Sequence, residues 1–111
     1  MGTDNNTPLT EATYYILLSL IRPNHGYGIM QNAQNLSEGR VRLAAGTLYG
    51  ALGTMCDKGW IVLLPADGSG RKKEYVLTEK GRQILIREVG RLSKMASEGE
   101  AAISMMNEED R

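Results

Sequence analysis

Residues Ala44–Trp60 read AAGTLYGALGTMCDKGW, and the rest of the chain can be interpreted around this segment. Its apolar residues recur at i, i+3, i+4 and i+7, which predicts one buried face of an amphipathic helix: Leu48, Ala51, Leu52 and Met55. The opposite face is small and polar, with Tyr49 on a flank: Thr47, Gly50, Gly53, Thr54 and Asp57. Each interior glycine costs roughly 1 kcal/mol relative to alanine. Either the open face leaves room for a close approach, or this is a plain core helix that carries glycines.

The residues that follow favour the first interpretation. Gly59 can end the helix, and residues 60–65 and 71–77 read as two strands around the polar turn 67–70. A basic cluster lies at this hairpin: Arg71, Lys72 and Lys73. A helix followed by a hairpin with cations near its tip is typical of a winged helix-turn-helix, whose helix enters the major groove. Alternatively, the three cations only form a solvated strand edge that prevents strand-to-strand aggregation.

Charge distribution agrees with that fold. The chain has 111 residues, a length that suits one domain. Its formal net charge is zero. Residues 40–82 hold eight Lys and Arg against four Asp and Glu, a net charge of +4, and the two flanks balance it. A basic middle between acidic ends suits phosphate contacts.

The sequence gives little indication of a disulfide, a metal or cofactor site, or a membrane segment. Cys56 is the only cysteine, so an intrachain disulfide is excluded and a buried inert thiol is expected. His25 is the only histidine and has no companions at ligand spacing, so we expect a helix cap or a packing role and no metal or cofactor. Neither a membrane span nor a signal peptide is indicated, which favours a cytoplasmic protein.

The first half of the chain contains two further predicted helices. One starts either at Thr7-Pro8, since Pro8 suits a first helical position, or at Leu9-Thr10 with Thr10 as N-cap, and it runs through Ile21. It is apolar on most sides, so either a second subunit or a central core covers it. The next spans residues 26–36, with Tyr27, Met30 and Ala33 on its inner face. Residues 40–43 alternate charged and apolar, which predicts a short strand paired with the hairpin.

The last third of the chain predicts a long helix capped by Thr78. Its apolar and small residues follow a 4-3 spacing for about three heptads: Leu85, Val89, Leu92, Ala96, Gly99, Ile103 and Met106. A helix from Thr78 to Met106 is about 40 Å long, more than a small globule covers. A second copy is therefore the expected partner, and the alternative is a helix folded back on its own domain.

These segments define the expected architecture. The fold class is mainly α with a small β-hairpin wing. Residues 1–77 form a winged helix-turn-helix domain, residues 78–107 a dimerisation helix and residues 108–111 a frayed tail. An apolar junction between two subunits is a plausible effector pocket, lined by Tyr15, Leu18 and Met95 or Ile103, although ordinary dimer packing explains the same residues.

The order and spacing of several segments resemble the PadR family of bacterial transcriptional regulators. The shared segments extend from Leu9 to Leu85 and comprise Leu9–Glu11, Leu17–Leu20, His25–Tyr27, Gly46–Tyr49 with Leu52, Gly59–Ile61 and Arg71–Arg82. The resemblance implies a homodimer that binds inverted-repeat operators in double-stranded DNA, usually as a repressor released by a small effector. The single C-terminal helix is similar to that of the smaller members.

Carried onto this chain, the resemblance implies a set of DNA-binding residues on the helix and the wing: Gly46, Thr47, Tyr49, Arg71, Lys72 and Lys73. Thr54, on the open polar face of the same helix, is a further candidate for DNA binding. Family members often carry more polar residues before this helix than Val41–Ala45, so we expect sparse base contacts and a contribution from operator shape. The alternative is a winged helix that binds an acidic protein rather than DNA. An enzyme is not expected, because the chain has no phosphate loop and no paired carboxylates in a predicted cleft.

Overall fold

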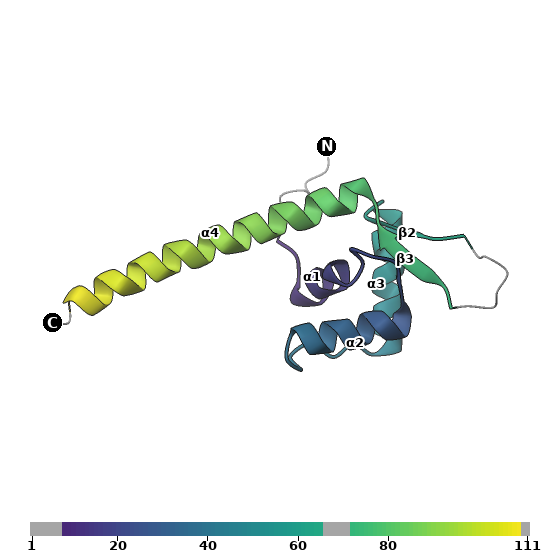
Figure 1. Ribbon diagram of the computed structural model, residues 1–111, viewed down its shortest axis with the longest axis horizontal. Helices are drawn as coiled ribbons and strands as arrows, with labels where there is room; N and C mark the ends of the chain where they lie inside the picture. Colours follow the sequence, from purple (N-terminus) through teal and green to yellow (C-terminus); the bar gives the residue numbers. More distant parts are fainter. Residues whose placement is uncertain (1–7, 66–71, 110–111) are drawn as a thin grey trace.

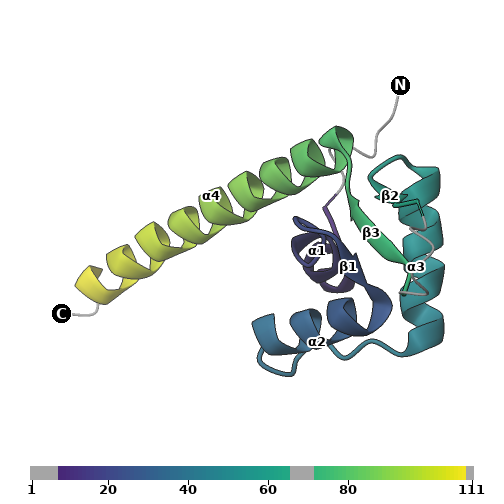
Figure 2. The same ribbon diagram turned by 45° about the vertical axis from the view of Figure 1, so that its right-hand side comes forward.

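The computed structural model describes residues 8–65 and 72–109. Along these ranges the elements are α1 (Glu11–Leu18), β1 (Asn24–His25), α2 (Gly26–Leu36), α3 (Ala45–Asp57), β2 (Ile61–Leu63), β3 (Glu74–Leu77) and α4 (Glu79–Glu109). Three helices gather beside the strands, and α4 projects far beyond them (Figures 1 and 2). The molecule is 67 Å long but only 21 Å across its shortest axis. The predicted fold class, mainly helical with a small wing and a long last helix, is confirmed.

Helix α1 begins at the second of the two expected starts, after Thr10, and ends three residues early. Thr10 caps it by accepting a hydrogen bond from the Thr13 backbone N–H at 3.1 Å. At its other end the Leu20 N–H turns back to the Leu17 carbonyl, and the Leu20 carbonyl accepts the N–H of Leu77 at 2.9 Å. The regular helix therefore stops at Leu18: the chain tightens into an i→i−3 turn at Leu20, and the Leu20 carbonyl is bonded to the sheet.

Helix α2 has the predicted bounds, but its inner face is different. His25 is the N-cap, and its Nδ1 accepts the Gly28 N–H at 3.1 Å, which confirms the capping role. Gly26, Ile29 and Ala33 are the buried residues of this helix. Tyr27 was predicted to face inward and is instead 58% exposed, because the 26-29-33 spacing defines the buried stripe and leaves position 27 outside it.

The predicted strand at residues 40–43 is absent. Val41 and Leu43 are buried, which accounts for the alternation, but the Val41 N–H bonds to the Ser37 hydroxyl at 2.8 Å. The strand that pairs with the hairpin is β1. The antiparallel sheet has the order β1-β3-β2, and Asn24 lies opposite Tyr75. The alternation of residues 40–43 therefore reflects the burial of Val41 and Leu43, and it did not predict which segment pairs with the hairpin.

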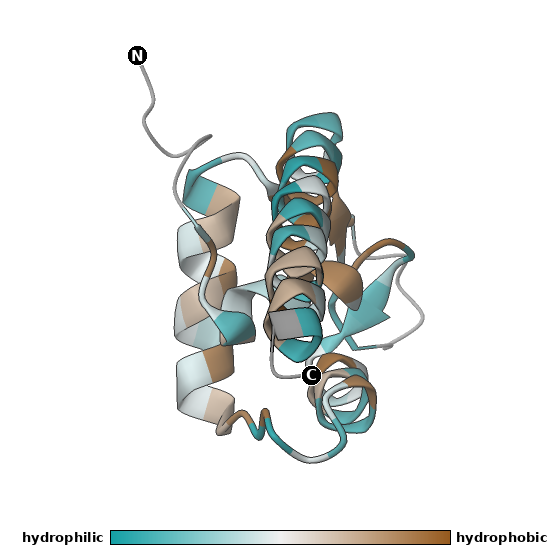
Figure 3. Cartoon of the chain, turned by 90° about the vertical axis from the view of Figure 1, so that its left-hand side faces the viewer, coloured by the Kyte–Doolittle hydropathy of each residue, from teal (hydrophilic) through white to brown (hydrophobic). Residues whose placement is uncertain are grey.

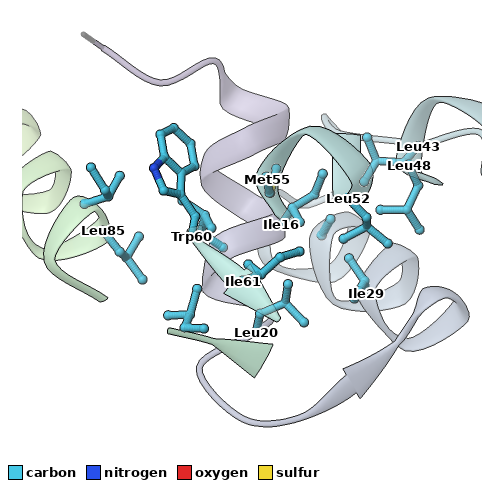
Figure 4. Close-up of a cluster of buried hydrophobic side chains, with 14 of the residues drawn as sticks. Ile16, Leu20, Ile29, Leu43, Leu48, Leu52, Met55, Trp60, Ile61 and Leu85 are labelled. Carbon is cyan, nitrogen blue, oxygen red and sulfur yellow. The ribbon is translucent and has the colours of Figure 1, made fainter. Parts of the chain in front are cut away.

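The core lies between the three short helices and the hairpin. Figure 4 shows side chains from α1, α2 and α3 meeting near the hairpin strand that follows Trp60, and the predicted buried stripe of α3 is part of this cluster, with Leu48, Leu52 and Met55 at most 3% exposed. Gly59, at φ +77°, ends the α3 segment as predicted. Gly81, in the first turn of α4, lies so close to the Trp60 carbonyl that a Cβ would collide with it.

Helix α4 is supported by the domain only at its start. The Thr78 hydroxyl accepts the Gly81 N–H at 3.1 Å, as an N-cap does. Ile84, Leu85 and Glu88 are buried, whereas every described side chain from Leu92 to Glu108 is exposed. Hydrophobic residues lie along the projecting part among hydrophilic ones (Figure 3). The helix continues through Glu109, so the first two residues of the predicted tail are helical.

Candidate nucleic-acid interface

The outer face of α3 is open along its length. Gly46, Thr47, Gly50, Gly53 and Thr54 are all exposed. A Cβ added at any of the three glycines would meet nothing within 4 Å. The Thr54 hydroxyl donates to the Gly50 carbonyl at 3.2 Å, and its oxygen retains the capacity to accept a hydrogen bond. Another molecule can thus approach the backbone of α3 closely.

The N-terminus of α3 is a source of unpaired donors. Its N-cap residue is Ala44, which makes no side-chain cap bond, and its first turn contains no acidic residue. Ala45, Gly46 and Thr47 are exposed there. The first N–H groups of a helix have no partner within it, and the helix dipole favours an anion at this end. This end of α3 is therefore chemically suited to a phosphate oxygen.

Tyr49 lies at the edge of this face and also has a packing role. It is 53% exposed, and its hydroxyl lies so close to Gly26 that a Cβ there would collide with it. The ring is thus held between α3 and the start of α2. Gly26 is required at this position because of that close approach.

The wing lies beside α2. Lys72 and Lys73 are exposed, whereas Arg71 lies outside the described residues. The Lys72 ammonium is 5.5 Å from the centroid of the Tyr27 ring, and the Tyr27 hydroxyl accepts a hydrogen bond from the Gln31 amide at 2.8 Å. A cation over an aromatic face is a favourable pair. The structure thereby joins the wing to the start of α2, which in turn touches Tyr49.

Sequence reasoning did not include Tyr27 and Gln31 in this surface. Both are exposed and belong to α2. Their sequence signal was the helical spacing of Gly26, Ile29 and Ala33, which leaves Tyr27 and Gln31, four residues apart, on the other side of the helix. Recognition of that stripe would have found them.

The residues predicted for dimerisation differ in their environment. Leu85 is buried in the core of its own chain. Val89 and Leu92 are 43% and 37% exposed, and the later positions are exposed as well: Ala96, Gly99, Ile103 and Met106. The chain itself therefore covers the first residue of the predicted seam and leaves the remainder open to solvent.

The residues predicted for an effector do not line the cavity found beside α3. Tyr15 and Leu18 are half-buried against the core, and Met95 is exposed on α4. A cavity of about 280 Å³ lies instead between the segment before α1, the second half of α3 and the hairpin, lined by Pro8, Leu9, Thr10, Thr13, Ala51, Thr54, Met55, Lys58 and Trp60. It contains none of the three predicted residues.

Two ionisable groups near α3 favour their neutral forms. Burial raises the pKa of the half-buried Cys56 thiol, and the nearby Asp57 carboxylate adds to the effect. Burial also raises the pKa of Tyr75. An uncharged thiol is a weak nucleophile. Cys56 is half-buried rather than buried, and its inert role stays a prediction. Within residues 8–65 and 72–109, no group of three or more His, Cys, Asp or Glu side chains is arranged to hold a metal ion, and no helix is long and apolar enough to cross a bilayer.

Comparisons with solved structures support the fold. A PadR family regulator from Clostridium difficile is 23% identical, covers 85% of this chain and 99% of its own, and superposes with a TM-score of 0.70. A PadR family regulator from Eggerthella lenta is 24% identical over 82% of this chain and 79% of its own, with a TM-score of 0.60. PadR from Bacillus subtilis, solved in complex with operator DNA, is 28% identical over 66% of this chain and 43% of its own, with a TM-score of 0.55.

Sequence comparison assigns the family. No curated protein sequence matches the chain. Residues 16–87 match the profile of the transcriptional regulator PadR-like family, and this range contains α2, α3 and the hairpin. A family of transcriptional regulators also confirms the expectation that the chain is not an enzyme. The chain belongs to the PadR-like family of transcriptional regulators.

Proposed function

We propose that the protein is a homodimeric repressor that binds an inverted-repeat operator in double-stranded DNA and is released by a small apolar or aromatic effector. The observation that carries this proposal is the exposed, uncapped start of α3 together with the exposed wing lysines, which the Lys72–Tyr27 pair and the Gly26–Tyr49 approach connect to α3 through the start of α2. The operator complex of the 28% identical Bacillus subtilis protein supports the same use of the fold.

In this proposal α3 is the recognition helix. Gly46 and Gly50 let its backbone approach the floor of the major groove, and Thr47 and Thr54 offer hydroxyls. Hydroxyls pair with several bases, and bidentate contacts need Arg, Lys, Asn or Gln, none of which α3 contains. Sequence preference then comes in large part from the shape and stiffness of the operator.

Phosphate contacts fix the protein on the duplex. The uncapped amides at the start of α3 bind one phosphate, Tyr49 lies beside them, and Lys72 and Lys73 bind the backbone next to the groove. Arg71, outside the described residues, is proposed to join the two lysines.

The second subunit covers α4. Exposed apolar side chains that recur along a projecting helix mark an interaction site, and the 4-3 spacing from Val89 to Met106 suits a copy of the same helix. Residues 1–77 then act as the DNA-binding domain and residues 78–107 as the dimerisation helix. The paired helices hold the two copies of α3 about one turn of DNA apart, ~34 Å, or a multiple of it.

Release by an effector requires different affinities for two arrangements of the dimer. A ligand at the subunit junction, near Tyr15, Leu18 and Met95, changes the angle between the subunits and thereby the distance between the two recognition helices. This function places the protein in the cytoplasm, with the chromosome.

Binding to the DNA upstream of the protein's own coding sequence tests the proposal. A gel shift at moderate salt is expected to show saturable binding that unrelated competitor DNA does not remove. Thr47→Glu supplies the acidic residue that the first turn of α3 lacks, which favours the helix, yet it places a negative charge at the phosphate site. We expect Thr47→Glu to abolish the shift and the neutral Thr47→Gln to weaken it less.

Absence of binding to any duplex by the folded wild type would contradict the proposal. It would favour the other use of this surface, in which Lys72 and Lys73 meet an acidic protein. Equal binding by Thr47→Glu and the wild type would remove α3 from the interface.

A further inference from the structure

A buried carboxylate joins the segment before α1 to the early part of α4. Glu88 is only 5% exposed, and its Oε2 accepts the backbone N–H of Leu9 at 3.2 Å. Arg91, one turn later on α4, donates to both oxygens, from Nε at 2.9 Å and from Nη2 at 2.7 Å. This two-point contact is the geometry in which Arg holds a carboxylate most firmly. It aims Glu88 at the segment before α1.

The segment that Glu88 holds is not packed on all sides. Leu9 packs against the core, yet Pro8, Leu9 and Thr10 also line the 280 Å³ cavity. Thr10 is in turn the N-cap of α1. The hydrogen bond from Leu9 to Glu88 therefore links the start of the first helix directly to the last one.

This joint lies where α4 leaves the domain. Ile84 and Leu85 anchor the helix in the core, and Glu88, one turn further, is its last buried side chain within the described residues. The first turn is also held at Gly81, against the Trp60 carbonyl, so these contacts define where α4 begins. Glu88 is the buried contact furthest along the helix, and its loss shortens the anchored length and lets the angle of α4 vary more widely.

The unsupported part of α4 amplifies any change of angle. At a rise of about 1.5 Å per residue, the helix extends roughly 30 Å from Glu88 to Glu108, so a tilt of about 5° displaces its end by roughly 2–3 Å. A displacement of this size approaches the rise of one base pair along DNA, about 3.4 Å.

We propose that Glu88 is a positioning residue for DNA recognition: through the Leu9 N–H and the Arg91 clamp it sets the angle of α4 and hence the half-site spacing that the protein accepts. The role of Glu88 in half-site spacing rests on the proposed function. Its role in setting the angle of α4 involves one chain only and does not depend on DNA binding.

A distance measurement within one chain tests the angle. Spin labels at the exposed positions Gln34 of α2 and Ser104 of α4, in a Cys56→Ser background, report the angle by double electron–electron resonance. Labelled protein is diluted into unlabelled protein so that each dimer carries one labelled chain. We expect Glu88→Ala to broaden the distance distribution by 2 Å or more. Glu88→Gln, which keeps an acceptor for Leu9, is expected to stay close to the wild type.

Glu98 provides the matched control. It is on the same helix and pairs with Lys94 at 3.8 Å, but both side chains are exposed and remote from the domain. Glu98→Ala is expected to leave the distribution unchanged. A Glu88→Ala distribution equal to that of the wild type, or a Glu98→Ala distribution broadened as much as that of Glu88→Ala, overturns the proposal. If Glu88→Ala does not fold, Arg91→Ala takes its place: broadening supports the joint and no change refutes it.

Binding to a set of operators tests the consequence for DNA. The half-sites are moved together or apart by one base pair at a time. The wild type is expected to prefer one spacing at least tenfold, and Glu88→Ala is expected to lose most of this preference while it keeps affinity for the best site within a fewfold. An unchanged preference overturns the role in spacing. A wild type that binds no operator refutes the proposed function, and the distance measurement still decides the role of Glu88 in the angle of α4.

Discussion

Replacement of Gly50 by alanine separates the stability of α3 from its proposed contact with DNA. A Cβ at Gly50 meets no atom within 4 Å, and the position lies in the interior of the helix. Alanine is favoured over glycine there by about 1 kcal/mol. For a chain near 100 residues this raises the melting temperature by roughly 4 °C. The variant is thus expected to be more stable than the wild type.

DNA binding by the same variant is expected to weaken. In the proposed complex the backbone of α3 lies against the groove, and an extra methyl in a close contact costs about 1–3 kcal/mol. Since about 1.4 kcal/mol corresponds to a factor of ten in affinity, Kd is expected to rise about tenfold or more. Calorimetric melting and fluorescence anisotropy with a labelled operator measure the two effects on one sample.

Gly90 of α4 is the matched control. It is also helical, and a Cβ there also meets nothing within 4 Å, so Gly90→Ala is expected to raise the melting temperature without a change in Kd. If Gly50→Ala is more stable and binds the operator as tightly as the wild type, the close approach of α3 to DNA is wrong. If it is less stable, the open face of α3 is wrong.

Three further predictions follow from the charges and the exposed helix. Alanine at both Lys72 and Lys73 is expected to weaken binding to all sequences and to reduce the slope of log K against log salt by about 2, as measured by anisotropy at several salt concentrations; an unchanged slope would remove the wing from the phosphates. Leu92→Glu is expected to yield a folded monomer in sedimentation, since its own chain leaves this side chain 37% exposed; a dimer of unchanged affinity would contradict the seam. The hydrogen bonds from Arg91 lower the pKa of Glu88 below its ordinary value, so the stability from this pair is present above that ordinary value and lost as pH falls through the lowered one. The difference in unfolding free energy between the wild type and Glu88→Gln is expected to shrink below about pH 4, and a constant difference down to pH 2 would argue against the pair.

Local patterns were sufficient for several elements. Thr10 and Thr78 could be predicted as caps because each is a hydroxyl residue followed by a glutamate in the first turn, whereas for His25 the sequence left a cap and a packing role open. The buried stripe of α3 was found because its period matches a helix with one covered side. The exposure of Thr47 and Gly50 followed directly from that stripe.

The sequence patterns did not predict which distant segments pair, or which chain covers the apolar side of α4. Val41 and Leu43 alternate like a strand because the core buries them, and nothing in their sequence shows that Asn24–His25 takes the place beside β3. The 4-3 spacing that includes Leu85 predicts a covered side but not which chain covers it. The joint at Glu88 was not predicted, because it links two residues 79 positions apart.

A hydroxyl-radical footprint of the wild type on its upstream DNA measures the arrangement of two recognition helices most directly. We predict two symmetric protected tracts whose centres lie about one helical turn of DNA apart, or a multiple of it. A single asymmetric tract, or uniform cleavage at saturating protein, would contradict the dimer and its paired contact with the operator.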